Sequence, residues 1–263
     1  SPESKVLVIA SDIAKYGVGT PGEPTQGAGS VAMLITQNPR IMAFNNDNVA
    51  QTRDIMDFWR PNYSSTPYVN GMYSTQQYLD CLTTTWDEYK KRYDWTMDDF
   101  AAICFHLPYP KLALKGLRKM MDKTLSQEKQ DSLKENFDKS ILYSQMIGNI
   151  YTGSLFLGLL SLLENAETLK AGDKIALYSY GSGAVSEFFS GELVEGYEAY
   201  LDKERLSKLK QRTALSVADY EKVFFEELQL DESGSAQFAG YEHQDYSLVE
   251  IVDHQRRYSK VEK

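Results

Sequence analysis

Segments with a strand pattern alternate with segments with a helix pattern along most of this chain of 263 residues. Short apolar runs favour strands, whereas apolar side chains spaced three and four residues apart favour amphipathic helices. The expected strands are residues 6–10, 30–36, 41–44, 101–105, 174–180, 184–189 and 246–258, and the expected helical segments are residues 75–91, 111–121, 151–163 and 201–228. This order predicts the α/β class, with mixed parallel and antiparallel pairing.

The individual runs predict local detail as well. Residues 6–10 lack polar alternation, which predicts a strand buried on both faces. Residues 30–36 and 41–44 are separated by the turn residues Asn38-Pro39, which predicts an antiparallel hairpin. Ser74 directly precedes the periodic segment 75–91, so we expect Ser74 to cap that helix.

Composition excludes several classes of protein. The 28 Lys and Arg against 37 Asp and Glu give a formal net charge of −9, which disfavours a surface for nucleic acid or anionic lipid. Two cysteines do not make a disulfide framework and are typical of a reducing cytoplasm. The longest nearly pure apolar run, residues 154–163, has about half the length that a membrane helix needs. We expect a cytoplasmic protein with neither nucleic-acid nor membrane partners.

Two glycine-rich segments match parts of catalytic motifs but lack the required context. Residues 17–22 match G-x-G-x-x-G, yet Pro24 and further glycines lead into a strand, where a dinucleotide site needs a helix. A structural loop and a substrate-lining loop both stay open. Residues 181–183 (GSG) form no nucleophile elbow, because Tyr180 and Ala184 stand where that motif has glycine. They are either a tight strand connection or a place where a backbone N–H approaches a carbonyl or anionic oxygen.

A histidine and a group of basic residues follow one of the expected strands. His106 ends the strand 101–105, at the kind of strand end where ligands bind in α/β sheets; a structural histidine is the alternative. Basic side chains lie along one side of the next helix: Lys111, Lys115, Arg118 and Lys119. They form either a solvated face or a phosphate-binding patch. Histidine and patch together suit a phosphorylated acyl carrier.

Six short segments carry a family pattern: SDIAKY (11–16), GEPTQGAG (22–29), DFWRP (57–61), FHLPY (105–109), GNIYTGS (148–154) and SYGSG (179–183). In order and spacing they resemble bacterial 3-hydroxy-3-methylglutaryl-CoA (HMG-CoA) synthase nearly from end to end. The resemblance implies a homodimer and a thiolase-type layered fold of two similar βαβαβαββ halves. Residues 1–95 would be the remainder of the first half plus an inserted helical region, and residues 96–263 the second half.

The resemblance also implies a reaction. HMG-CoA synthases condense acetyl-CoA with acetoacetyl-CoA in the mevalonate route to isoprenoids, with CoA thioesters as substrates and with no metal or further cofactor. A cysteine is acetylated, a glutamate removes a proton from the acetyl methyl group, the carbanion attacks the acetoacetyl ketone, and water releases the product.

Matched positions imply roles for individual residues. His106 matches the family histidine that binds the acetoacetyl group and assists as an acid. Asn149 matches the asparagine beside the reacting acyl group, and Ser182 matches the residue whose backbone N–H helps to stabilise the thioester oxyanion. Three further groups of family positions are matched: substrate contacts by Thr25 and Ser74, the grip on CoA by Lys111 and Lys115, and polar positions around the acyl pocket by Asp12, Tyr16 and Asp57.

The family's nucleophile has no counterpart here. Neither Cys81 nor Cys104 occupies its place, which falls before Ser1, as does that of the glutamate. We therefore expect this chain to be the carboxyl-terminal two-thirds of the enzyme, cut or trimmed, and inactive alone. Two alternatives stay open: a relative that acts on carrier-protein substrates in polyketide β-branching, and a non-catalytic CoA-binding or assembly module.

Overall fold

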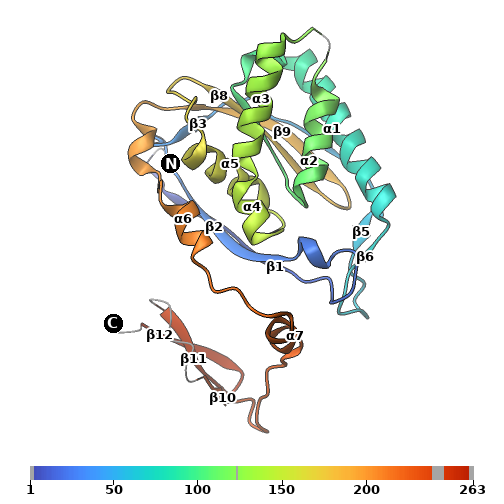
Figure 1. Cartoon of the computed structure of the whole chain (residues 1–263), viewed down its shortest axis with the longest axis vertical. Coiled ribbons are helices and arrows are strands. Elements are labelled where there is room, and N and C mark those ends of the chain that lie inside the picture. The colour runs from blue at the N-terminus through green and yellow to red at the C-terminus, as the bar shows by residue number, and fades with distance from the viewer. Residues whose placement is uncertain (1–2, 123, 239–245, 261–263) are drawn as a thin grey trace. The chain divides into compact units, whose positions relative to one another are not determined.

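The structure is a computed structural model that describes residues 3–122, 124–238 and 246–260 (Figure 1). The chain divides into two compact units, Ser1–Arg212 and Thr213–Lys263, and each is described by itself. The predicted site residues all lie in the larger unit. The division into thiolase halves at residue 95 is of a different kind and stays a prediction.

Five strands form one mixed sheet in the described part of the larger unit. β3 (Met42–Phe44) and β4 (Val49–Thr52) pair antiparallel with β9 (Val185–Leu193). β9 also pairs antiparallel with β8 (Lys174–Gly181), and β7 (Ala102–Phe105) lies parallel to β8 at the edge. The predicted α/β class with mixed pairing is therefore confirmed.

Side chains of β7 and β8 alternate between two hydrophobic clusters, one on each face of the sheet. Ile103, Phe105 and Tyr178 belong to the first cluster, and Cys104 and Leu177 to the second. All five are at most 2% exposed. Burial on both faces explains why β7 and the middle of β8, residues 175–178, are apolar.

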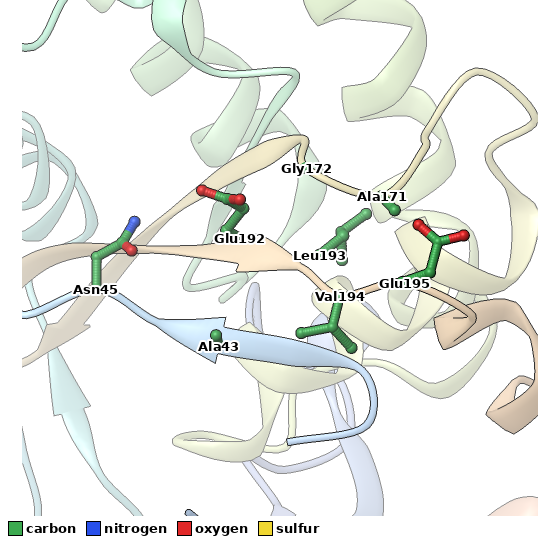
Figure 2. A pocket seen from close by; sticks show the side chains of 8 residues that line it. All are labelled: Ala43, Asn45, Ala171, Gly172, Glu192, Leu193, Val194 and Glu195. Atoms are coloured by element: carbon green, nitrogen blue, oxygen red, sulfur yellow. The ribbon is translucent and has the colours of Figure 1, made fainter. Parts of the chain in front are cut away.

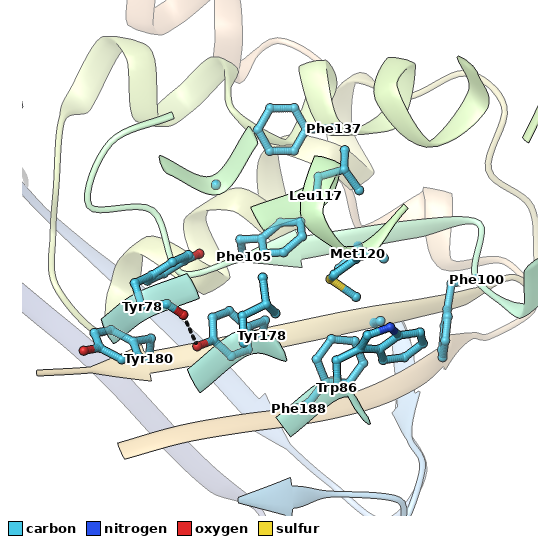
Figure 3. Packing of buried hydrophobic residues seen from close by; sticks show 14 of the residues in the cluster. Tyr78, Trp86, Phe100, Phe105, Leu117, Met120, Phe137, Tyr178, Tyr180 and Phe188 are labelled. Atoms are coloured by element: carbon cyan, nitrogen blue, oxygen red, sulfur yellow. Dashed lines mark hydrogen bonds between the residues drawn. The ribbon is translucent and has the colours of Figure 1, made fainter. Parts of the chain in front are cut away.

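Three helices cover the first face: α1 (Gly71–Tyr93), α2 (Pro110–Met120) and α3 (Gln127–Ser140) (Figure 1). Aromatic rings fill the space between these helices and the sheet. Tyr78 meets Tyr178 edge to face, with ring centres 5.3 Å apart, and the Tyr178 hydroxyl donates to the Tyr78 carbonyl oxygen at 3.1 Å (Figure 3).

α5 (Gly153–Asn165) covers the second face, so the layers run helix, sheet, helix. Both faces need such a cover because both are apolar. The shorter elements of the larger unit are α4 (Leu142–Ile147), α6 (Arg205–Lys210), the helical turns η1 (Glu23–Thr25), η2 (Met97–Asp99) and η3 (Tyr197–Tyr200), and the paired strands β5 (Phe58–Trp59) and β6 (Tyr68–Val69).

β1 (Val6–Ala14) and β2 (Gly27–Ile35) form an antiparallel ribbon. The predicted hairpin between residues 30–36 and 41–44 is wrong, because β2 pairs with β1 whereas β3 pairs with β9. A short gap between two apolar runs does not fix their pairing when each run has a better partner elsewhere.

The burial predicted for residues 6–10 is also wrong for the part of the chain described. Val6, Leu7, Val8 and Ile9 are 41–60% exposed. In the described residues the ribbon has two strands, and α5 and α4 contact it without covering both faces. An apolar run shows that a strand suits burial, but neighbouring elements must supply the cover.

α1 begins at Gly71, not at residue 75 as predicted. Asn70 is its N-cap, and its side-chain oxygen accepts from the Tyr73 backbone N–H at 3.1 Å. The prediction that Ser74 caps this helix is therefore wrong. Ser74 lies in the first turn, where its backbone N–H donates to the Asn70 carbonyl oxygen at 2.8 Å. Since Asn caps as well as Ser does, the Ser74 hydroxyl is left for another partner.

The smaller unit contains α7 (Val217–Phe225) and a sheet in the order β10 (Ala236–Gln237), β11 (Tyr246–Val252), β12 (Gln255–Lys260). The single strand predicted over residues 246–258 is two strands, because Asp253 and His254 adopt left-handed backbone conformations and reverse the chain. The helical pattern over residues 201–228 likewise divides into α6 and α7.

Phe188 on β9 tests the packing of the first cluster. It is fully buried, with ring centres 5.1 Å from Trp86 and 4.8 Å from Tyr89. We expect Phe188→Ala to lower the free energy of unfolding by about 3–5 kcal/mol, because it opens a cavity. Phe44→Ala, at a ring 49% exposed in the same sheet, should cost less than about 1 kcal/mol. Urea denaturation measures both values, and equal losses would contradict this packing.

Candidate active site

A buried carboxylate joins three segments of the larger unit. Asp57, at 0% exposure, accepts hydrogen bonds at Oδ2 from the Tyr180 hydroxyl (2.8 Å), the Ser182 hydroxyl (2.9 Å) and the Ser74 hydroxyl (3.3 Å). Its Oδ1 accepts from the Gly183 backbone N–H at 3.2 Å. Two residues predicted from the sequence, Ser74 on α1 and Ser182 after β8, are thereby brought together on one side chain.

Neutral donors make this burial possible. A carboxylate is stable away from water only when hydrogen bonds replace its hydration. Burial raises the pKa of Tyr180, and the hydrogen bond to Asp57 raises that pKa further. The Tyr180 phenol therefore keeps its proton and remains a donor to Asp57.

Ser182 lies in the exposed turn between β8 and β9. The strand ladder ends at Gly181 opposite Val185, so the Ser182 backbone N–H lies outside it. Gly183 has φ = 130°, a conformation that favours glycine. Asp57 holds both the Ser182 hydroxyl and the Gly183 backbone N–H, which fixes the turn in place. The Ser182 backbone N–H can then meet an oxygen of a bound molecule.

His106 ends β7 and is held through its backbone. Its N–H donates to the Tyr178 carbonyl oxygen at 2.7 Å, and its carbonyl oxygen accepts from the Tyr78 hydroxyl at 3.0 Å. The imidazole has no hydrogen-bond partner among the described residues. Burial lowers its pKa to about 4, so the ring is neutral at pH 7. The neutral ring can donate one hydrogen bond through its N–H. The role expected from the sequence was different, that of an acid that transfers a proton near neutral pH.

Asn149 has both ends of its side-chain amide engaged. Its Oδ1 accepts from the Tyr151 backbone N–H and from the Ser154 hydroxyl, each at 2.9 Å. Its Nδ2 donates to the Tyr16 hydroxyl at 3.0 Å. An amide nitrogen carries two N–H bonds, and the second has no acceptor among the described residues.

A close approach of two backbones positions Asn149. The Asn149 N–H donates to the Thr25 carbonyl oxygen at 3.0 Å, which brings a third predicted residue to this side of the site. A Cβ on Gly27 would lie 2.6 Å from the Asn149 carbonyl oxygen, and one on Gly148 would lie 1.9 Å from that of Gln26. Glycine is therefore required at both positions.

Aromatic contacts connect these groups, although no direct hydrogen bond between His106, Asn149 and Ser182 is found in the described residues. Phe58, next to Asp57, has its ring centre 5.9 Å from that of Tyr16, which holds Asn149. On the other side Tyr78, which holds the His106 carbonyl, has its ring centre 5.2 Å from that of Tyr180 (Figure 3). Phe58 thus contacts the tyrosine that holds Asn149, and Asp57 accepts from the tyrosine that packs against Tyr78.

Lys111 and Lys115 lie exposed and one turn apart on α2, which begins four residues after His106. Neither forms an ion pair with a described residue, whereas Lys119 lies 3.6 Å from Asp80. The first two charges of the predicted basic patch are therefore available to an anion from outside.

Neither cysteine is built as a nucleophile. Cys81 on α1 and Cys104 on β7 are unpaired and buried. Burial raises the pKa of both thiols, that of Cys104 to about 12. A thiol attacks as its thiolate, so both side chains are inert near neutral pH.

A hollow of about 480 Å³ lies away from the predicted residues (Figure 2). It is lined by Ala43, Asn45, Ala171, Gly172, Glu192, Leu193, Val194 and Glu195. These residues flank the start of β8, whereas Ser182 follows its end, about 25 Å away at 3.3 Å per residue. The described residues contain no cluster of three or more His, Cys, Asp and Glu that could hold a metal ion.

Sequence reasoning did not identify every side chain that holds the site. Gln26 accepts at Oε1 from the backbone N–H groups of Tyr16 and Gly17, at 2.7 and 3.1 Å. Tyr180 and Ser154 lie inside the matched segments without an assigned role. A partner that acts through another side chain has no spacing pattern of its own, so these links become visible only in three dimensions.

Comparison with known proteins decides the family. The family model described as "Hydroxymethylglutaryl-coenzyme A synthase C terminal" matches residues 48–137 and 118–258. The chain belongs to the hydroxymethylglutaryl-CoA synthase family.

Among the described residues, no helix combines the length and apolar character that a membrane crossing requires.

Three similar proteins support this assignment. Hydroxymethylglutaryl-CoA synthase of Enterococcus faecalis is 52% identical over 232 residues, which cover 88% of this chain and 60% of that protein. A crystal structure of HMG-CoA synthase complexed with CoA matches with a TM-score of 0.95 at 65% identity, over 99% of this chain and 67% of that one. The polyketide biosynthesis 3-hydroxy-3-methylglutaryl-ACP synthase PksG of Bacillus subtilis (strain 168) is 31% identical, over 85% of this chain and 57% of that protein. The chain thus spans about 60% of the length of these two curated relatives.

The Asp57 network predicts a stability effect. In Asp57→Asn an amide NH₂ replaces one acceptor oxygen among four donors, so buried hydrogen bonds are lost. We expect the free energy of unfolding to fall by about 2–4 kcal/mol. Asp54→Asn, three residues away and exposed, should change it by less than about 0.5 kcal/mol. Urea denaturation of the two variants measures the difference, and similar small values would argue against the network.

The lowered pKa of His106 predicts a pH effect. The folded imidazole has a pKa of about 4 against 6.5 in the unfolded chain, so between these values the unfolded chain binds more protons. The contribution of His106 to the free energy of unfolding is therefore complete above pH 6.5 and is lost as the pH falls towards 4. From pH 7 to 4, wild type should lose up to about 3 kcal/mol more than His106→Gln, as measured by urea denaturation. His254→Gln, at an exposed position, should keep the wild-type profile.

Proposed function

We propose that this chain carries the acetoacetyl-CoA side of an HMG-CoA synthase, which condenses acetyl-CoA with acetoacetyl-CoA in the mevalonate pathway. Family membership supports the reaction class. The observation that carries the proposal is the network around Asp57, which ties Ser74 to Ser182 and leads through aromatic contacts to Asn149 and His106.

Three N–H groups would act on the substrate. The backbone N–H of Ser182 would meet the thioester oxygen, and the second N–H of Asn149 would meet the reacting acyl group. The neutral imidazole of His106 would donate to the acetoacetyl ketone oxygen, where negative charge develops as the carbanion attacks. Fixed donors of this kind contribute about 3 kcal/mol each in comparable sites.

Binding would use the remaining predicted residues. The exposed ammonium groups of Lys111 and Lys115 would hold the phosphates of CoA, since their charges have no partner in the described residues. Thr25 and Ser74 would contact the substrate, Thr25 beside Asn149 and Ser74 beside Asp57.

We propose that neither Cys81 nor Cys104 is the cysteine that becomes acetylated. We also propose that none of the residues named here is the general base. Buried thiols with raised pKa support this view. The chain alone is then expected to bind acetoacetyl-CoA without turnover. A homodimer, which the family resemblance implies, and a cytoplasmic location, with which the two cysteines are compatible, remain predictions.

A carrier-protein substrate is the second candidate, because PksG is among the relatives. The identity of 52% to the Enterococcus faecalis enzyme against 31% to PksG favours the CoA substrate. A non-catalytic CoA-binding module is the third candidate, and it shares the binding prediction but predicts no condensation in any longer form of the protein.

Calorimetric titration tests the CoA assignment. Replacing Lys111 and Lys115 together by Ala should weaken acetoacetyl-CoA binding by about tenfold and leave acetoacetyl-pantetheine, which lacks the nucleotide phosphates, unchanged. Lys119→Ala, on the same helix but paired with Asp80, is the matched control and should change neither. Equal weakening of both ligands, or preference for an acyl carrier protein over CoA, would contradict the assignment.

A further inference from the structure

The Ser154 hydroxyl links a group that can only donate a hydrogen bond, the Ile150 N–H, to a group that can only accept one, the Asn149 Oδ1. Ser154 lies in the first turn of α5 at 0% exposure. Its Oγ accepts from the Ile150 backbone N–H and donates to the Asn149 Oδ1, each at 2.9 Å. Because an N–H can only donate and an amide oxygen can only accept, the hydroxyl proton must point at Asn149.

This arrangement decides which way round the Asn149 amide faces. Oδ1 lies between two donors, the Ser154 hydroxyl and the Tyr151 N–H. A rotated amide would place its NH₂ group against the same Tyr151 N–H, donor against donor. In the observed orientation, one Nδ2–H reaches the Tyr16 hydroxyl and the other has no described acceptor.

The same two hydrogen bonds also strengthen the amide as a donor. Hydrogen bonds accepted by an amide oxygen draw electron density from its nitrogen, and linked hydrogen bonds polarise one another. Ser154 further ties down the turn that carries Asn149, in which Tyr151 adopts a left-handed conformation at φ = 49°. Without the hydroxyl, the buried Ile150 N–H would have no acceptor from this side chain.

We propose that Ser154 is a positioning residue, which fixes and polarises the Asn149 amide so that one Nδ2–H faces the carbonyl oxygen of the bound acyl group. The inference rests on the proposed function for its ligand, and on the hydrogen bonds of Ser154 for its geometry. Ser154 itself touches no reacting atom in this scheme.

Ser161 offers a matched control on the same helix. It is also 0% exposed, and its hydroxyl likewise makes two hydrogen bonds, to the Lys139 carbonyl oxygen (2.6 Å) and from the Tyr143 N–H (3.3 Å). Ser154→Ala and Ser161→Ala should therefore lose similar stability in urea denaturation. Only the first variant removes a partner of Asn149.

Calorimetric titration of the whole chain compares acetoacetyl-CoA with CoA. Ser154→Ala should weaken acetoacetyl-CoA binding by about fivefold, the loss expected for one weakened hydrogen bond, and CoA binding by less than about twofold. Ser161→Ala should change both by less than about twofold. Equal weakening of both ligands by Ser154→Ala, or the same acyl-specific loss in Ser161→Ala, would overturn the proposal.

A ligand-free measurement keeps the test independent of the proposed function. In chain labelled with ¹⁵N-asparagine, the side-chain NH₂ signals of Asn149 are identified by their absence in Asn149→Asp. These signals should shift or broaden in Ser154→Ala and stay in place in Ser161→Ala. Unchanged signals in Ser154→Ala would overturn the proposal. Wild-type chain that fails to bind acetoacetyl-CoA would instead count against the proposed function, with the spectra still deciding the role of Ser154.

Discussion

A carboxylate buried among neutral donors is the constraint on which this site depends. Asp57 has 0% exposure and accepts from three hydroxyls and one backbone N–H, so its charge is stabilised only while all four donors stay in place. That requirement fixes the start of α1 relative to the turn after β8. The turn carrying Ser182 is consequently held by Asp57, while the Ser182 backbone N–H lies outside the strand ladder.

The other half of the site follows the same principle. Asn149 is held by groups that satisfy all but one of its hydrogen-bonding positions, and His106 is held by its backbone, with its imidazole left unpaired in the described residues. Burial keeps that imidazole neutral, since desolvation disfavours its charged form. The chemistry of the site is therefore that of fixed neutral donors, which suits oxygen atoms on which negative charge develops. The charges that suit phosphates lie outside it, on the exposed face of α2.

Some of the structure could be predicted, and the failures have physical causes. The apolar runs Ala102–Phe105 of β7 and Ile175–Tyr178 of β8 were sufficient, because strand segments buried on both faces are continuously apolar. The same criterion was wrong for Val6 to Ile9, since apolar character does not supply a covering neighbour. Ser74 was wrong as a cap because Asn70 serves equally well, and Ser74 turns to Asp57 instead. Pairing of β2 with β1 could not be read from the distance between runs along the chain.

The amino-acid sequence by itself determined the α/β class, the absence of a dinucleotide or nucleophile-elbow context in its glycine segments, and, through six matched segments, the family. These are properties of local pattern, and the side chains along a strand or helix carry them directly. Only the tertiary structure decided that Asp57 is the shared partner of Ser74 and Ser182, that Ser154 donates to Asn149, and that burial lowers the pKa of His106. Hydrogen-bond partnership and desolvation depend on which distant residues fold together, and no spacing along the chain encodes them.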